Sequence, residues 1–133
     1  MQPVNKDSKL TESVEDYLES VLVLSSKLPH VRSVDVASHL GFSKPSVSHA
    51  VKLLSDEGLL EVTQKKFLVL TEKGKEIAER TYARHVFFTD MLMSIGVDQT
   101  TAENDACRIE HVISQETFDA IEKYYKENNE QAD

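Results

Sequence analysis

The stretch SVDVASHLGFSKPSVSHAVKLLSDEG, residues 33–58, decides the fold. Its first eight residues form a short amphipathic pattern that stops at Gly41, and a second helical pattern starts near Lys44 and closes at Gly58. A glycine directly after a helix can adopt the left-handed backbone that ends it, so the two glycines mark the two stops. The stretch therefore predicts a helix, a tight turn and a second helix.

The sequence on either side extends this pair of helices into a larger unit. Upstream, apolar residues at spacings of three and four over Thr11–Ser25 predict an amphipathic helix, with Thr11 or Ser13 as its cap. Downstream, Leu59–Thr63 and Phe67–Leu70 are β-rich runs around a short basic turn, which predicts a hairpin. The order helix, helix-turn-helix, hairpin is that of a winged helix.

The rest of the chain predicts three more helices. A long helix is capped by Thr71 and runs to Gly96, a short one follows Thr100 or the next threonine, and a last amphipathic helix is capped by Ser114. The polar end from Lys126 on is expected to fray.

The predicted fold is thus mainly α with a small β-hairpin, in two domains. A winged helix-turn-helix domain spans residues 1–72, and a helical metal-binding and dimerisation module spans residues 73–133. The 133 residues carry no apolar run near the roughly 20 that span a bilayer, and the start lacks the apolar run of a secretion signal. The single cysteine, Cys107, cannot form an internal disulfide. We expect a cytoplasmic protein with no membrane partner.

Charge is unevenly spread along the chain. The net charge of -8 argues against a nucleic-acid partner, but residues 32–80 carry 8 basic and 7 acidic side chains, whereas residues 81–133 carry 4 and 11. The middle of the chain can therefore present a neutral-to-basic face to phosphate, while the acidic C-terminal part can attract cations.

The second helix of the pair carries short or polar side chains where it is expected to face a DNA major groove. These are Lys44, Pro45, Ser46, Ser48 and His49, while Val47, Val51, Leu53 and Leu54 are expected to form its inner face. Lys65 and Lys66 at the hairpin tip are placed for contact with the DNA backbone. The alternative for these residues is an ordinary helix start and two solvated lysines. Winged helices also serve as protein-interaction domains, which is the alternative for the arrangement as a whole.

Metal-ligand residue types recur at helical spacings. Cys107, Glu110 and His111 stand at positions i, i+3 and i+4, which share one face of a helix and suit a borderline first-row cation. A buried cysteine beside an exposed Glu-His pair would explain the spacing as well. Asp16 and Glu19, in another segment, have a solvated acidic face as their alternative. His85, in a third, could equally be a surface or core-edge histidine.

Several motifs together resemble the diphtheria-toxin-repressor family of metal-dependent transcriptional regulators, its manganese-transport-regulator branch in particular. The resemblance covers nearly the whole length. It rests on Glu15-Asp-Tyr-Leu-Glu19, Ser43-Lys-Pro-Ser-Val-Ser48, Leu70-Thr-Glu-Lys-Gly74, Arg84-His85 and above all Ala106-Cys-Arg-Ile-Glu-His-Val-Ile-Ser114.

This resemblance implies a repressor that binds operator DNA as a homodimer when it is loaded with Mn(II) or Fe(II), with metal-uptake genes as targets. By position, the family's primary metal site is carried over to Asp16, Cys107, Glu110 and His111. A second, adjacent site is carried over to Glu19 and His85, and Glu103 matches a further ligand position of the iron branch.

The carried-over site is a hybrid of the two branches. The manganese branch usually has a carboxylate where Cys107 stands, and the iron branch usually has a methionine where Asp16 stands. The thiolate favours Fe(II), Co(II) or Zn(II), so we expect that Co(II) and Zn(II) can also bind in vitro. Glu103 has a second interpretation, as the closing residue of a capping box that starts at Thr100, and this is the interpretation that we favour.

Two rival functions use the same residues differently. A winged-helix repressor could sense an organic ligand, or oxidation at Cys107, with the acidic residues merely solvated. A metal-dependent enzyme would also use such ligands, but no general base stands beyond them, so we expect neither an enzyme nor an organic cofactor.

Overall fold

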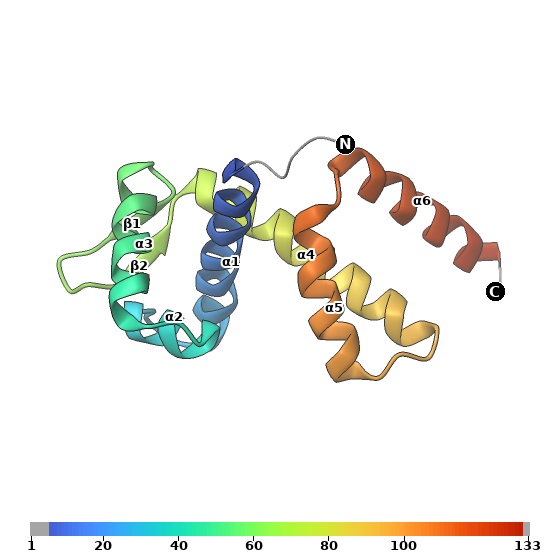
Figure 1. The fold of residues 1–133 in the computed structure, drawn as a ribbon, viewed down its shortest axis with the longest axis horizontal. Coiled ribbons are helices and arrows are strands. Elements are labelled where there is room, and N and C mark those ends of the chain that lie inside the picture. Colours follow the sequence, from blue (N-terminus) through green and yellow to red (C-terminus); the bar gives the residue numbers. More distant parts are fainter. Residues whose placement is uncertain (1–5, 132–133) are drawn as a thin grey trace. The chain divides into compact units, whose positions relative to one another are not determined.

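The structure is a computed structural model that describes the backbone of residues 6–131 and the side chains of residues 12–129. Over this range the chain forms six helices and one two-stranded sheet (Figure 1). They are α1 (Lys6–Lys27), α2 (Ser33–Leu40), α3 (Lys44–Asp56), β1 (Leu60–Val62), β2 (Leu68–Leu70), α4 (Glu72–Ser94), α5 (Gln99–Val112) and α6 (Gln115–Gln131). The mainly α fold with one small hairpin is confirmed.

The chain divides into two compact units within α4, one ending at Arg80 and the other beginning at Thr81. The first unit holds α1, α2, α3 and the hairpin, and the second holds the rest of α4 with α5 and α6. The predicted domain boundary after residue 72 lies at the start of α4, and it stays a prediction.

The helix-turn-helix forms as its sequence predicts. Gly41 has φ 72°, the left-handed conformation that ends α2, and Ser43 caps α3 by accepting a hydrogen bond from the Ser46 amide at 3.3 Å. Val47 and Leu54 are buried, but Leu53 is 48% exposed. Its assignment to the inner face is therefore wrong, because a helix turns about 100° per residue and Leu53 lies on the outer side of Leu54.

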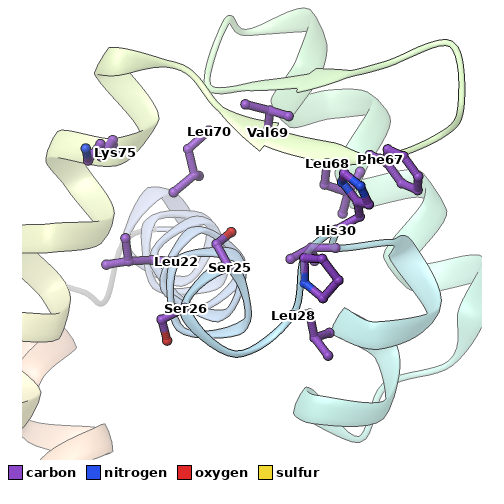
Figure 2. Close-up of a pocket in the computed structure, with 12 residues that line it drawn as sticks. Leu22, Ser25, Ser26, Leu28, His30, Phe67, Leu68, Val69, Leu70 and Lys75 are labelled. Carbon is purple, nitrogen blue, oxygen red and sulfur yellow. The ribbon is translucent and has the colours of Figure 1, made fainter.

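The hairpin is antiparallel, with Leu60 opposite Leu70 and Val62 opposite Leu68. Its strands are shorter than predicted because Thr63 and Phe67 belong to the turn, where the Thr63 amide donates to the Phe67 carbonyl at 2.9 Å. An open pocket of about 440 Å³ is lined by the end of α1 and the residues after it, by Phe67 and β2, and by Lys75 of α4 (Figure 2).

An apolar core fills the first unit. It unites side chains of α1, α2, α3, the hairpin and the start of α4, including Leu18, Val21, Val36, Val47 and Leu60. The hydroxyl of Thr71 accepts a hydrogen bond from the Gly74 amide at 3.1 Å, which confirms Thr71 as the cap of α4. A β-carbon on Gly74 would overlap the carbonyl of Leu59, so this position requires glycine.

Two predicted helix starts are wrong. α1 begins at Lys6, so Thr11 and Ser13 lie inside the helix. α5 begins at Gln99 and is capped by Asp98, whose carboxylate accepts a hydrogen bond from the Thr101 amide at 3.1 Å. At the start of α5 several nearby residues were capable of capping, and Asp98 is the one that does so.

The last helix starts as predicted but runs further. Ser114 caps α6 by accepting a hydrogen bond from the Thr117 amide at 3.1 Å. The helix continues past Lys126 to Gln131, so the predicted frayed end is helical there, and residues 132–133 lie outside the described residues. No helix of the part of the chain that the structure describes is long and apolar enough to cross a membrane.

The second unit has a small aromatic core. Phe88 of α4, Ala106 of α5 and Phe118 of α6 are buried together. Phe87 packs edge-on against Phe118 and Tyr125, with ring centroids 5.4 and 5.5 Å apart. This core packs α5 against side chains of α4 and α6, and so fixes which face of α5 is turned toward those helices.

Candidate metal centre

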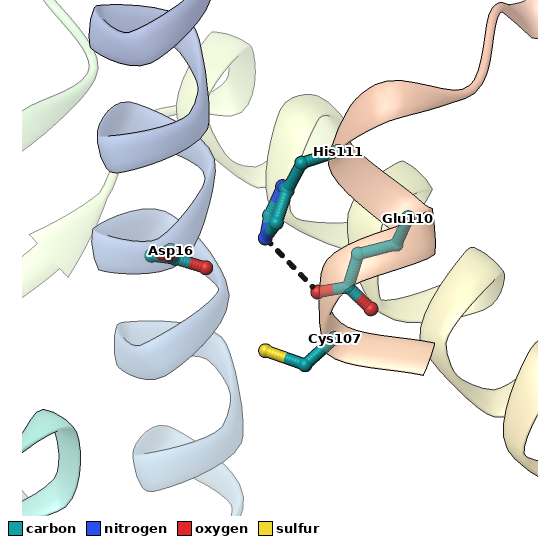
Figure 3. Close-up of side chains that lie close together, drawn as sticks. All are labelled: Asp16, Cys107, Glu110 and His111. Carbon is teal, nitrogen blue, oxygen red and sulfur yellow. Dashed lines mark ion pairs between the residues drawn. The ribbon is translucent and has the colours of Figure 1, made fainter. Parts of the chain in front are cut away.

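Three ligand-type side chains share one face of α5. Cys107, Glu110 and His111 point the same way from the helix (Figure 3), and a sulfur, a carboxylate oxygen and an imidazole nitrogen from them lie within 4.8 Å of one another. The helical register over Gln99–Val112 alone produces this convergence, as the spacing predicts. The alternative of a buried cysteine beside an exposed Glu-His pair is wrong, because Cys107 is exposed and Glu110 is fully buried.

The carboxylate of Glu110 lies between two imidazoles. Its Oε2 is 2.9 Å from Nδ1 of His85, and its Oε1 is 3.3 Å from Nε2 of His111 without the geometry of a hydrogen bond. His85 comes from α4, in the same unit. One fully buried carboxylate thus reaches histidines from two helices.

This environment fits a divalent cation. A buried carboxylate is costly unless a cation or hydrogen-bond donors compensate it, and Oε1 of Glu110 is buried without a donor. A thiolate, a carboxylate and an imidazole together suit a borderline first-row metal. The three donors of α5 leave coordination positions free, because such metals take at least four ligands.

The remaining predicted ligands come from α1 and from the first half of α5. Asp16, which Figure 3 also labels, and Glu19 lie one turn apart on α1, in the first unit. Burial and, second, the charge of Asp16 raise the pKa of the neighbouring Tyr17. Glu103 is exposed on α5 and accepts a hydrogen bond from Nε2 of Gln99 at 3.1 Å. The capping box that was favoured for Glu103 is wrong, because the cap is Asp98.

The predicted DNA-reading side chains are all exposed in the first unit: Lys44, Pro45, Ser46, Ser48 and His49 on α3, and Lys65 and Lys66 on the hairpin turn. Lys66 has φ 67°, a left-handed conformation that closes the turn.

Sequence reasoning did not single out two side chains that contact the hairpin turn at Phe67. His30 stacks on Phe67 with ring centroids 4.1 Å apart, and the guanidinium of Arg32 lies 5.1 Å from the centroid of the same ring. A basic residue directly before the helix pair was the available signal. Arg84 entered the sequence analysis only as part of a motif and was given no role there, and the structure buries it next to His85.

Two family models match the chain. The model described as "Iron dependent repressor, N-terminal DNA binding domain" matches residues 9–68, and "Iron dependent repressor, metal binding and dimerisation domain" matches residues 71–131. The transcriptional regulator MntR of Escherichia coli is 33% identical over 116 residues, which are 87% of this chain and 75% of that protein. MntR of Salmonella typhimurium is 30% identical over 128 residues, 96% of this chain and 82% of that protein.

The fold is also similar to solved structures. The manganese regulator SloR matches with a TM-score of 0.76 and 26% identity over 85% of this chain. A manganese-dependent transcriptional repressor in complex with manganese also matches with a TM-score of 0.76, at 21% identity over 84% of this chain. The chain spans about half the length of these two, 53% and 51%. With both family models and the MntR proteins in agreement, the chain belongs to the iron-dependent repressor family, the diphtheria-toxin-repressor family of metal-dependent transcriptional regulators.

Proposed function

We propose that this protein represses transcription by binding operator DNA as a homodimer when it holds Mn(II) or Fe(II), and that its target genes serve metal uptake. The observation that carries the proposal is the fully buried carboxylate of Glu110, which lies between His85 and His111 on the helix that presents Cys107. Family membership supplies the DNA-binding and dimerisation roles of the two parts.

The proposed primary ligands are Asp16, Cys107, Glu110 and His111, and the proposed second site uses Glu19 and His85. The incomplete donor set of α5 supports ligands from a further helix, and α1 offers two carboxylates one turn apart. A bound metal would supply positive charge that compensates the buried carboxylate of Glu110 and coordination positions for the donor atoms of the ligand side chains. Glu103 remains the weakest candidate, since its carboxylate is exposed and bonded to Gln99.

The identity of the metal follows from the donors and from supply. Cys107 adds a thiolate, which favours Fe(II), Co(II) and Zn(II) over Mn(II), while the carboxylates keep Mn(II) a good fit. Affinity for a given site generally increases from Mn(II) through Fe(II) to Co(II). The physiological metal therefore also depends on the concentration of each metal in the cell. The related regulator ScaR has been solved with bound Zn²⁺ and with bound Cd²⁺.

The proposed regulation is a linkage between ligand binding and DNA binding. The proposed ligands on α1 belong to the unit that carries α3. In this proposal, the conformation of the protein that binds the metal is also the conformation that binds DNA. A coupling of about 1–3 kcal/mol would shift operator affinity roughly 5- to 150-fold, and the operator would tighten metal binding by the same factor. A dimer that reads two half-sites implies a roughly palindromic operator.

Fluorescence anisotropy with a candidate palindromic operator tests the proposal. Binding is measured with chelator and then with Mn(II), Fe(II), Co(II) or Zn(II), on wild type and on Glu110→Ala/His111→Ala. The matched control is Asp105→Ala/Arg108→Ala, because both residues are exposed on the same helix. Operator affinity that requires metal and is lost only in Glu110→Ala/His111→Ala supports the proposal. Tight operator binding that changes neither with metal nor in either variant would contradict it.

The exposure of Cys107 favours one alternative, a repressor that senses thiol oxidation or an organic ligand. In that case operator affinity would ignore the chelator and change on treatment with peroxide, and Cys107→Ser would abolish the change. The relatives are transcriptional regulators, and we expect no enzymatic activity from this chain.

A further inference from the structure

A buried guanidinium joins the three helices of the second unit. Arg84 of α4 is 8% exposed, and its Nη1 donates to the carbonyl oxygens of Glu110 at 3.0 Å and Ile113 at 3.1 Å. Its Nη2 donates to Oε1 of Gln115, the first residue of α6, at 2.7 Å. The guanidinium also lies 5.5 Å from the ring centroid of Phe118. One side chain of α4 thus holds the end of α5 and the start of α6.

The C-terminal end of α5 gives a physical reason for a positively charged side chain such as Arg84 at this place. The helix stops at Val112, and Ile113 has extended dihedral angles of φ -90° and ψ 138°. The last carbonyls of a helix lack amide partners from the next turn and carry partial negative charge. Arg84 donates to the Glu110 carbonyl in place of such an amide, with charge-assisted hydrogen bonds.

Two neighbouring residues of α4 therefore hold the same residue of α5. Arg84 binds the backbone carbonyl of Glu110, and His85 contacts its carboxylate at 2.9 Å. The carboxylate of Glu110 lies between two imidazoles, and its position depends on where the backbone of Glu110 is held. Arg84 contacts the backbone of Glu110, and the same guanidinium also contacts Gln115, so it links that backbone to α6.

We propose that Arg84 is a positioning residue of the metal centre, which fixes Glu110 so that its carboxylate stays between His85 and His111. This inference rests on the proposed role of Glu110 as a ligand. Groups that orient metal ligands typically change metal affinity by about 10- to 100-fold when they are removed. Arg84 meets that description through the backbone of the ligand.

Co(II) binding tests this role, by calorimetry for affinity and by the visible absorption of the bound ion for ligand geometry. In Arg84→Gln we expect affinity to fall by about 10- to 100-fold and the absorption spectrum of the saturated protein to change. Arg84→Lys should recover part of the loss, because an ammonium can donate to one carbonyl but lacks the planar fork. The matched control, Arg80→Gln, removes an exposed arginine one turn earlier on α4 and should bind as wild type.

A second variant covers the case in which Arg84→Gln does not fold. Gln115→Met removes the 2.7 Å contact with Arg84, together with the hydrogen bond that Nε2 of Gln115 donates to Oδ1 of Asp119 at 2.8 Å, and should give a smaller loss of Co(II) affinity in the same direction. If Arg84 merely stabilises the fold, its substitution should lower the unfolding temperature and leave the Co(II) affinity and the spectrum of the folded protein unchanged.

The outcomes separate this inference from the proposed function. If wild type binds Co(II), Glu110→Ala does not, and both Arg84→Lys and Gln115→Met match wild type in affinity and spectrum, only the role of Arg84 is overturned. If wild type does not bind Co(II), or Glu110→Ala binds it equally well, the proposed metal centre itself is wrong.

Discussion

The two units place their functional groups differently with respect to their interiors. The interior of the first is mainly apolar, although Glu15 and Ser20 are also buried there, and its predicted DNA-reading side chains are all on the outside. The second has only a small aromatic core, beside which it buries the charged groups of Arg84 and Glu110. The first unit can therefore change its reading surface at little cost in stability, whereas in the second unit the candidate site is part of the interior.

The largest effect is expected from the apolar core of the first unit. Leu18→Ala should lower the free energy of unfolding by about 2–5 kcal/mol, because Leu18 is fully buried and the change leaves a cavity. Urea unfolding followed by circular dichroism measures the loss. Leu53→Ala is the matched control, since Leu53 is 48% exposed and should cost no more than about 0.5 kcal/mol. Equal losses in the two variants would contradict the assignment of the core.

Metal should stabilise the protein through the second unit. At Mn(II) concentrations near 100 times its dissociation constant, the free energy of unfolding should rise by about 2.7 kcal/mol, because the ion binds only the folded state. Thermal unfolding with and without Mn(II) measures the gain, and a chelator should reverse it. Glu110→Ala/His111→Ala should show no gain; an undiminished gain in that variant would place the metal elsewhere.

The wing is expected to contribute electrostatically and modestly. Lys65→Gln or Lys66→Asn should each reduce the slope of log affinity against log salt by about 1, because each removes at most one phosphate contact. Asparagine is chosen at Lys66 because it tolerates the φ of 67°. Anisotropy titrations at several salt concentrations measure the slope. Lys75→Gln, which removes an exposed lysine paired with Glu79, is the control, and a matching decrease there would mean a non-specific effect.

The smallest effect is expected at the start of α5. Hydrogen bonds from Thr101 lower the pKa of Asp98 below its ordinary value of 3.8. A carboxyl group with a lowered pKa stabilises the fold above its ordinary pKa, and this contribution is lost as the pH falls through the folded-state value. Asp98→Asn keeps an acceptor without the titration. In thermal unfolding, the stability of wild type relative to Asp98→Asn should therefore decrease on acidification. A stability difference that stays constant with pH would show that the charge of Asp98 does not stabilise the fold.

Sequence patterns succeeded where one local feature determines the outcome. Gly41 ends α2, and Thr71 and Ser114 cap their helices, because a turn residue or a capping oxygen acts within a few residues. The patterns failed where neighbours compete: Asp98 caps α5 although Thr100 was expected to. Leu53 was misplaced for a related reason, since successive residues of a helix point about 100° apart and the packing of α3 buries Leu54 and leaves Leu53 exposed.

The sequence by itself determined that Cys107, Glu110 and His111 converge, because the period of one helix settles which side chains share a face. Only the tertiary structure decided that Glu110 is the buried member, that His85 contacts its carboxylate and that Arg84 holds its carbonyl. Those relations depend on how α4, α5 and α6 pack. Packing is set by many weak contacts between residues far apart in the chain, and no local pattern records them.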